Sequence, residues 1–221
     1  MLGHFKNLSK LFPTDTLTNR VRLVYTDETN RTEHCPIILP PITTEELSWV
    51  DLASFDGLFI NMISGFDISL ETLKWIREQT AAYIHLDVHA LVLGELSQDA
   101  NIPRRITGVR NWREWVANVD SIQMNETESD WFGAPEITSE KQLLAEIRKL
   151  SDENGSPKTV VITRAERGAT SFDFTHEKIW NKAPVQRNVL NTTGSGDVFG
   201  ALYILTKTLG TSEQEALWHV R

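Results

Sequence analysis

From Asp56 onward the sequence alternates between short apolar runs and segments with helical periodicity, and this alternation constrains the fold more than any other feature. Short apolar runs are typical of strands buried on both faces, whereas apolar residues three or four positions apart indicate a helix that buries one side. Alternation of the two predicts a largely parallel sheet covered by helices on both faces. The predicted strands are 57–63, 83–88, 121–124 and 159–163, and the predicted helices are 69–80, 111–118 and 140–150.

The N-terminal part of the chain follows a different pattern. Val21, Leu23 and Tyr25 alternate with other residues, residues 27–30 form a polar turn, and a second extended run covers 32–39. Two such runs around a turn predict a β-hairpin. We therefore expect residues 1–40 to form an N-terminal segment with a small β-hairpin, and residues 41–221 to form the α/β domain.

Bulk properties exclude several classes of function. The formal net charge is −8, whereas surfaces that bind nucleic acid are normally basic. Cys35 is the single cysteine, so no internal disulfide can form. No apolar run approaches the length that crosses a membrane, and residues 1–13 lack the apolar core of a secretory signal. These observations predict a cytoplasmic protein without nucleic-acid or membrane partners.

A glycine-rich loop carries the clearest chemical signal in the chain. Residues 191–200 read Asn-Thr-Thr-Gly-Ser-Gly-Asp-Val-Phe-Gly, between a strand-like run at 184–190 and a helix-like run at 198–209. Backbone N–H groups at such a helix start favour bound anions. Asp197 would repel a bound phosphate unless it takes a proton from an attacking hydroxyl, and phosphoryl transfer needs both parts. The alternative is a plain turn followed by Asp197 as a helix N-cap.

Other polar residues follow the predicted strands at the point where each strand ends. Asp87, Asn125, Thr163 and the 194–197 loop all occupy such positions. Ligands of parallel sheets bind beyond the carboxyl ends of the strands, so we expect these groups to share one crevice. His85 and His89 flank Asp87, but on a strand they are too far apart to converge on one metal ion, so we do not expect a zinc site there.

Three segments resemble one known family. The segment around Gly194–Asp197 resembles the C-terminal signature of the ribokinase-like (PfkB) carbohydrate kinases, usually Asp-Thr-x-Gly-Ala-Gly-Asp-x-Phe. Residues 119–128 resemble the strand that ends in the family's Asn-x-x-Glu motif, and residues 159–169 resemble the strand and loop that hold the nucleotide phosphates. The three occur in the family's order, and the resemblance extends from about residue 18 onward. It implies a three-layer α/β/α fold with a mostly parallel sheet and a small β lid.

The resemblance also implies roles for individual residues. Asp197 would be the catalytic base, and the backbone of Gly194, Ser195 and Gly196 would form an anion hole for the transferred phosphoryl group. Asn191 would bind the substrate hydroxyl or an adjacent monovalent cation. The ATP side of the site would be formed by Asn125, Glu128, Thr163 and Gly168, with Glu128 holding Mg²⁺ through water.

The chain departs from the family pattern at several of these positions. Asn191 stands where the family commonly has Asp, and Ser195 replaces the usual alanine. Ala165 stands at a family glycine and Arg164 at an apolar position, which puts nucleotide affinity in question. Without the resemblance, Asn125 and Glu128 are better explained as a capped helix start with solvated acids, and a plain β-turn explains residues 163–171 equally well.

The resulting prediction is an ATP- and Mg²⁺-dependent carbohydrate kinase that phosphorylates a sugar hydroxyl, with dimerisation through the lid as a further expectation. The family's Gly-Gly sugar-binding motif is missing, and the chain stops at Arg221 inside a helix-like run that starts near Ser212. We therefore also expect a protein truncated at both ends with little activity. The alternative is a catalytically weak or inactive binding protein on the same fold. An unrelated nucleotide-binding domain is disfavoured, because the sequence has no P-loop and no Rossmann glycine motif.

Overall fold

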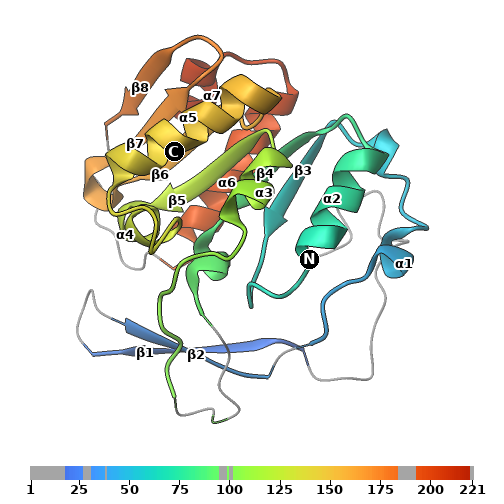
Figure 1. Ribbon diagram of the computed structural model, residues 1–221, viewed down its shortest axis with the longest axis vertical. Coiled ribbons are helices and arrows are strands. Elements are labelled where there is room, and N and C mark those ends of the chain that lie inside the picture. Colours follow the sequence, from blue (N-terminus) through green and yellow to red (C-terminus); the bar gives the residue numbers. More distant parts are fainter. Residues whose placement is uncertain are drawn as a thin grey trace.

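The computed structural model describes residues 18–26, 31–37, 39–94, 99, 102–183 and 193–219. Within them, six strands form one sheet in the order β3-β4-β5-β6-β7-β8 (Figure 1). The first four pair in parallel and the last two are antiparallel. The sheet is therefore mostly parallel, as predicted. Its strands are β3 (Gly57–Asn61), β4 (Tyr83–Asp87), β5 (Ser121–Asn125), β6 (Thr159–Thr163), β7 (Ala169–Asp173) and β8 (Lys178–Lys182).

Helices cover both faces of the sheet and complete the predicted α/β/α arrangement (Figure 1). One face carries α2 (Leu70–Gln79), α3 (Trp112–Ala117) and α5 (Glu140–Asn154), and the other carries α6 (Ser195–Thr208) and α7 (Glu213–His219). Short elements complete the description: α1 (Thr44–Leu47), η2 (Leu52–Ser54), η3 (His89–Val92), α4 (Glu126–Trp131) and η4 (Ala165–Arg167). None of the described helices is both long and apolar enough to cross a membrane.

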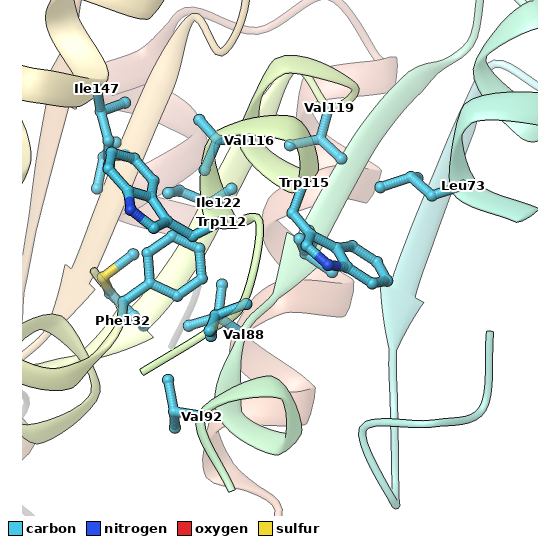
Figure 2. Packing of buried hydrophobic residues seen from close by; sticks show 14 of the residues in the cluster. Leu73, Val88, Val92, Trp112, Trp115, Val116, Val119, Ile122, Phe132 and Ile147 are labelled. Carbon is cyan, nitrogen blue, oxygen red and sulfur yellow. The ribbon is translucent and has the colours of Figure 1, made fainter. Parts of the chain in front are cut away.

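The larger core lies between the sheet and α2, α3 and α5. Trp112 and Trp115 of α3 point toward the sheet, where Ile122 of β5 lies fully buried (Figure 2). Leu73 from α2 and Ile147 from α5 close the same cluster. These residues lie at the apolar helical spacings from which the helices were predicted, so burial of those faces holds the layer on the sheet.

Side-chain caps fix where the helices begin. The hydroxyl of Ser69 accepts from the N–H of Thr72 at the start of α2, and Ser139 does the same for Gln142 at the start of α5. α5 ends at Gly155, whose positive φ of 73° suits the left-handed C-cap position of a residue without a Cβ. The predicted helix therefore runs four residues beyond 150.

Three elements differ from the sequence prediction. α6 begins at Ser195, so the glycine loop already forms the first turn of the helix that was predicted from 198. α4 and the β7–β8 hairpin were not predicted, because both are short and β8 mixes lysines with apolar residues. The predicted strand 184–190 lies outside the described residues.

The predicted N-terminal hairpin is present as β1 (Arg20–Tyr25) and β2 (Arg31–Ile37), which we call the lid. The two strands pair antiparallel in a sheet of their own, separate from the main sheet (Figure 1). Val21, Val24 and Tyr25 are exposed on it. The lid is tied to the α/β domain through Arg104, whose N–H donates to the carbonyl of Glu33 at 2.7 Å.

We expect the backbone amides of the lid to exchange with solvent much faster than those of β4, β5 and β6. Two strands alone are marginal in water, and no further strand of the described residues pairs with either edge of this hairpin. Hydrogen exchange of the purified protein, with its oligomeric state measured in parallel, checks this. Protection of residues 20–37 equal to that of the central strands, in a demonstrated monomer, would contradict the expectation.

Candidate active site

The carboxyl ends of the parallel strands bring together polar residues that are far apart in the sequence. Asn61, Asp87 and Gln123 end or nearly end β3, β4 and β5, and the strand register pairs Asn61 with Asp87 and Asp87 with Gln123. Asn125 pairs in the same way with Thr163 of β6. The N-terminus of α6 reaches this row of residues, because Gln123 contacts Gly196. The predicted strand-end residues and the glycine loop therefore gather at one edge of the sheet.

The glycine loop forms the start of α6. Gly194 is the N-cap, with a φ of 79°, and Ser195, Gly196 and Asp197 are the first three helical residues. The reading of Asp197 as an N-cap is therefore wrong, since that position belongs to Gly194. The exposed carboxylate of Asp197 instead accepts a hydrogen bond from Nδ2 of Asn61 at 2.9 Å. Within the described residues, the helical ladder begins at the N–H of Val198, so the N–H groups of Ser195, Gly196 and Asp197 precede it, and N–H groups at a helix start attract anions.

Asp87 lies behind this loop and is almost fully buried. Its Oδ1 accepts from the backbone N–H of His89 at 2.9 Å, and its Oδ2 accepts from Nε2 of Gln123 at 2.9 Å. Burial raises the pKa of Asp87 to about 6, and the negative charges of Glu128 and Asp197 act in the same direction. The end of β4 thus holds a carboxyl group that titrates closer to neutrality than an exposed aspartate.

The Asn125 and Glu128 pair forms a reciprocal capping box at the start of α4. The side chain of Asn125 accepts from the N–H of Glu128 at 2.9 Å, and Oε2 of Glu128 accepts from the N–H of Asn125 at 2.7 Å. The capped helix start is therefore real, but Glu128 is not a solvated acid, because only 5% of it is exposed. Glu126 is also engaged, in ion pairs with Arg164 and Arg167.

His89 connects Glu128 to the lid. Its Nδ1 lies 2.7 Å from Oε1 of Glu128, and its Nε2 lies 3.6 Å from Oε2 of Glu33 on β2. Hydrogen bonds to Glu128 and then Glu33 raise the pKa of His89 to about 10. Glu33 also pairs with Arg104, and the hydroxyl of Tyr25 lies 3.1 Å from Oγ1 of Thr193, next to the glycine loop. These contacts hold the lid over the strand ends.

The loop after β6 is a tight 3-10 turn rather than a plain β-turn. Thr163 ends β6 half-buried, and the N–H of Arg164 donates to the carbonyl of Gly168 at 2.7 Å. Ala165 has a φ of 48°, a left-handed conformation that favours the glycine found in the family. The guanidinium of Arg164 pairs with Glu140 on α5, which explains why an arginine fits where the family has an apolar residue. Asn191 lies outside the described residues.

Carboxylate oxygens at these strand ends are the ligand type that Mg²⁺ prefers. Within the described residues, however, no group of three or more His, Cys, Asp or Glu side chains is placed to hold a metal ion. The two carboxylate oxygens of Glu128 also already form hydrogen bonds with Asn125 and His89. Within the described residues, these side chains therefore do not form a metal site built from protein ligands alone.

The sequence did not identify three residues that connect parts of the site. Asn61, Gln123 and His89 each join two parts of the site, yet none belongs to a family motif named above. A usable signal was present for Gln123, a polar residue between apolar neighbours in a predicted buried strand, whereas Asn61 is exposed at the end of β3 and gave no such signal. A buried polar side chain needs a partner, so such positions identify contacts in advance.

His85 supplies a pH prediction for this region. Burial lowers the pKa of His85 to about 4 in the folded protein, whereas the same side chain has a pKa near 6.5 in the unfolded chain. Between these two values the unfolded chain binds a proton that the folded protein does not. As the pH falls from 6.5 to 5, this single group should remove about 1.6 kcal/mol of stability, since the loss approaches about 1.4 kcal/mol per pH unit once the unfolded histidine is mostly protonated. Urea unfolding of wild type and His85→Gln across this range measures it. Parallel curves for the two proteins would contradict the prediction.

Comparisons with known proteins agree with this geometry. The family described as pfkB family carbohydrate kinase matches residues 95–217, which is more than half of the 221-residue chain. The chain therefore belongs to this family, and the resemblance predicted from its motifs is confirmed. A search among curated proteins found no sequence match.

Solved structures of the ribokinase family share the fold. A pyrophosphate-dependent kinase in the ribokinase family, in a sulfate complex, superimposes with a TM-score of 0.73 at 14% identity, over 92% of this chain and 66% of that one. Ribokinase from Thermotoga maritima gives 0.64 at 18% identity, over 90% and 59%. Adenosine kinase from Schistosoma mansoni, in complex with 2-fluoroadenosine, gives 0.66 at 17% identity, over 92% and 60%. The chain thus spans about two thirds or less of the length of these proteins.

Proposed function

We propose that this chain carries the phosphoryl-transfer centre of a carbohydrate kinase, which moves the γ-phosphoryl group of ATP to a sugar hydroxyl. The observation that carries the proposal is the start of α6, where Asp197 lies one turn from the N-cap Gly194 and is held by Asn61. Among the described residues, N–H groups that precede the helical ladder meet a carboxylate there, at the carboxyl end of the sheet. Membership of a kinase family supports the same chemistry.

In the proposed reaction, Asp197 accepts the proton of the substrate hydroxyl as its oxygen attacks the γ-phosphorus. The bond from that phosphorus to the β,γ-bridging oxygen breaks, and ADP leaves with the bond's electron pair. The N–H groups of Ser195, Gly196 and Asp197 at the N-terminus of α6 stabilise the charge on the transferred group. Mg²⁺ would supply further positive charge at the phosphates, with Glu128 as its indirect protein contact.

The remaining roles follow the family pattern. Thr163 and Gly168, in the turn after β6, would contact the donor phosphates next to Asn125, which is paired with Thr163 in the sheet. Asn191 would contact the acceptor hydroxyl. We also propose that the protein acts in the cytoplasm and pairs with a second copy through the exposed lid, as suggested by its open strand edges.

The test measures donor and acceptor separately. The purified protein is assayed for sugar-dependent release of ADP from ATP with Mg²⁺, and pyrophosphate is offered as a second donor because one similar structure is a pyrophosphate-dependent kinase. Sugars, inositols and nucleosides serve as acceptors. Acceptor-dependent transfer that disappears in Asp197→Asn supports the proposal. Transfer that is independent of Asp197, or binding of neither donor by the folded protein, contradicts it.

The alternative, a binding protein with weak or no activity, is favoured by two observations. Ala165 adopts a left-handed conformation where the family has glycine, and the oxygens of Glu128 are already engaged by Asn125 and His89. Both reduce the fit to a nucleotide with Mg²⁺. Saturable binding of a sugar or nucleotide without turnover over many hours would favour this alternative over the kinase.

A further inference from the structure

Gln123 lies buried between the two halves of the candidate site. Only 2% of it is exposed, and its Nε2 donates both to Oδ2 of Asp87 at 2.9 Å and to the carbonyl oxygen of Gly196 at 3.0 Å. We infer that Gln123 is a positioning residue that fixes the direction of the Asp197 backbone N–H, and through it the anion hole. The catalytic consequence of this inference rests on the proposed function, whereas the positioning itself does not.

The physical link is the planarity of the peptide bond. The carbonyl of Gly196 and the N–H of Asp197 belong to one planar trans unit and point in opposite directions, so a bond that holds the carbonyl also aims the N–H. The helical ladder of α6 begins with the N–H of Val198, which donates to the carbonyl of Gly194 at 3.0 Å. The N–H of Asp197 precedes that ladder and donates to no helical carbonyl, whereas the carbonyl of Gly196 lies within α6. The peptide unit is therefore held by the helix and, on the same carbonyl, by the additional bond from Gln123.

The direction of the Gln123 amide is itself fixed from two sides. Its two N–H hydrogens match two acceptors, the carboxylate of Asp87 and the carbonyl of Gly196. Its Oε1 faces Nε2 of His85 at 3.4 Å, and Nδ1 of His85 lies 2.7 Å from Oγ of Ser121. Because the pKa of buried His85 is low, its ring is neutral, with one donor for Gln123 and one acceptor for Ser121.

Aromatic packing keeps this chain of polar groups in place. The ring of His85 stacks on Phe59 with centroids 5.5 Å apart and tilts against Tyr203 of α6 at 4.9 Å. Gly200, one turn further along α6, leaves room for Phe59 and Gln123, since a Cβ there would lie 2.4 Å from the Phe59 ring. The first turns of α6 therefore rest on side chains of β3, β4 and β5 whose positions are mutually determined.

The test compares wild type with Gln123→Met, which keeps the length of the side chain and removes both donors. The control is Gln79→Met, the same substitution at an exposed position at the end of α2. We expect the ¹⁵N order parameter of the Asp197 amide, measured without ligands, to fall from about 0.85 to below about 0.6 in Gln123→Met. Amides in the middle of α6 and all amides of the control should keep their values.

We also expect kcat to fall about 10- to 100-fold in Gln123→Met with KM changed by less than about threefold, since a misdirected anion hole acts on the transition state. An unchanged Asp197 order parameter in the folded variant overturns the inference, even if the wild type proves to have no kinase activity. A lowered order parameter with unchanged kcat overturns the catalytic consequence. If Gln123→Met does not fold, Gln123→Glu takes its place, because it keeps the volume and the His85 contact but presents an oxygen to Gly196.

Discussion

Replacing Asp197 by Asn should lower turnover by about 10²- to 10⁴-fold while leaving the fold and nucleotide binding largely intact. The amide cannot take a proton from the substrate hydroxyl, yet it has the same shape and its oxygen can still accept from Asn61. Stability should change by less than about 1 kcal/mol, because only the favourable charge at the helix start is lost. The measurement is sugar-dependent ADP release, with ATP affinity and urea unfolding determined on the same samples.

Asp130→Asn is the matched control for this experiment. It makes the same change of charge at an exposed position of α4 and should leave turnover unaltered. Near-normal turnover of Asp197→Asn would remove Asp197 from the chemistry. If activity is lost only together with folding or with ATP binding, the assignment of Asp197 as the base fails as well, since the substitution would then act through structure.

Replacing Gly168 by Ala should destabilise the protein by at least about 3 kcal/mol. Gly168 has a φ of 90°, and a Cβ at this position would lie 1.9 Å from the backbone oxygen of Lys182 on β8. The strands β7 and β8 are paired along their whole length, so the clash cannot be relieved without shifting the ladder. This glycine is therefore required for the fold as well as for the proposed phosphate contact.

The variant Gly155→Ala separates the cost of the positive φ from the cost of the clash with β8, the two causes of the destabilisation expected for Gly168→Ala. Gly155 has a similar φ of 73°, but a Cβ there has no other atom within 4 Å, so its replacement should cost only about 1 kcal/mol of conformational strain. Urea unfolding followed by tryptophan fluorescence measures both variants. Equal losses of stability at the two positions would show that the close approach of β8 contributes nothing.

Several features of this protein were determined by local sequence alone. Continuous apolar runs predicted four parallel strands, because such strands are buried on both faces. Helical spacing of apolar residues predicted three helices, because each buries one face against the sheet. Strand ends predicted which polar residues gather at one edge of the sheet, since parallel strands present their carboxyl ends together. The motif around Gly194 and Asp197 identified the family, because it places a turn, free N–H groups and a carboxylate within a few residues.

Only the tertiary structure decided how the parts of the site hold one another. The contacts of Asn61 with Asp197, of Gln123 with Gly196, and of His89 with Glu128 join residues between 39 and 136 positions apart. Glu128 likewise looked like a surface acid in its own segment and became buried because α4 folds back beside η3 and β5. Hydrogen-bond partners across strands depend on register and layer packing, which local periodicity does not encode. The sequence therefore identified the family and the candidate residues, and the packing of α6 on the strand ends determined which side chains contact them.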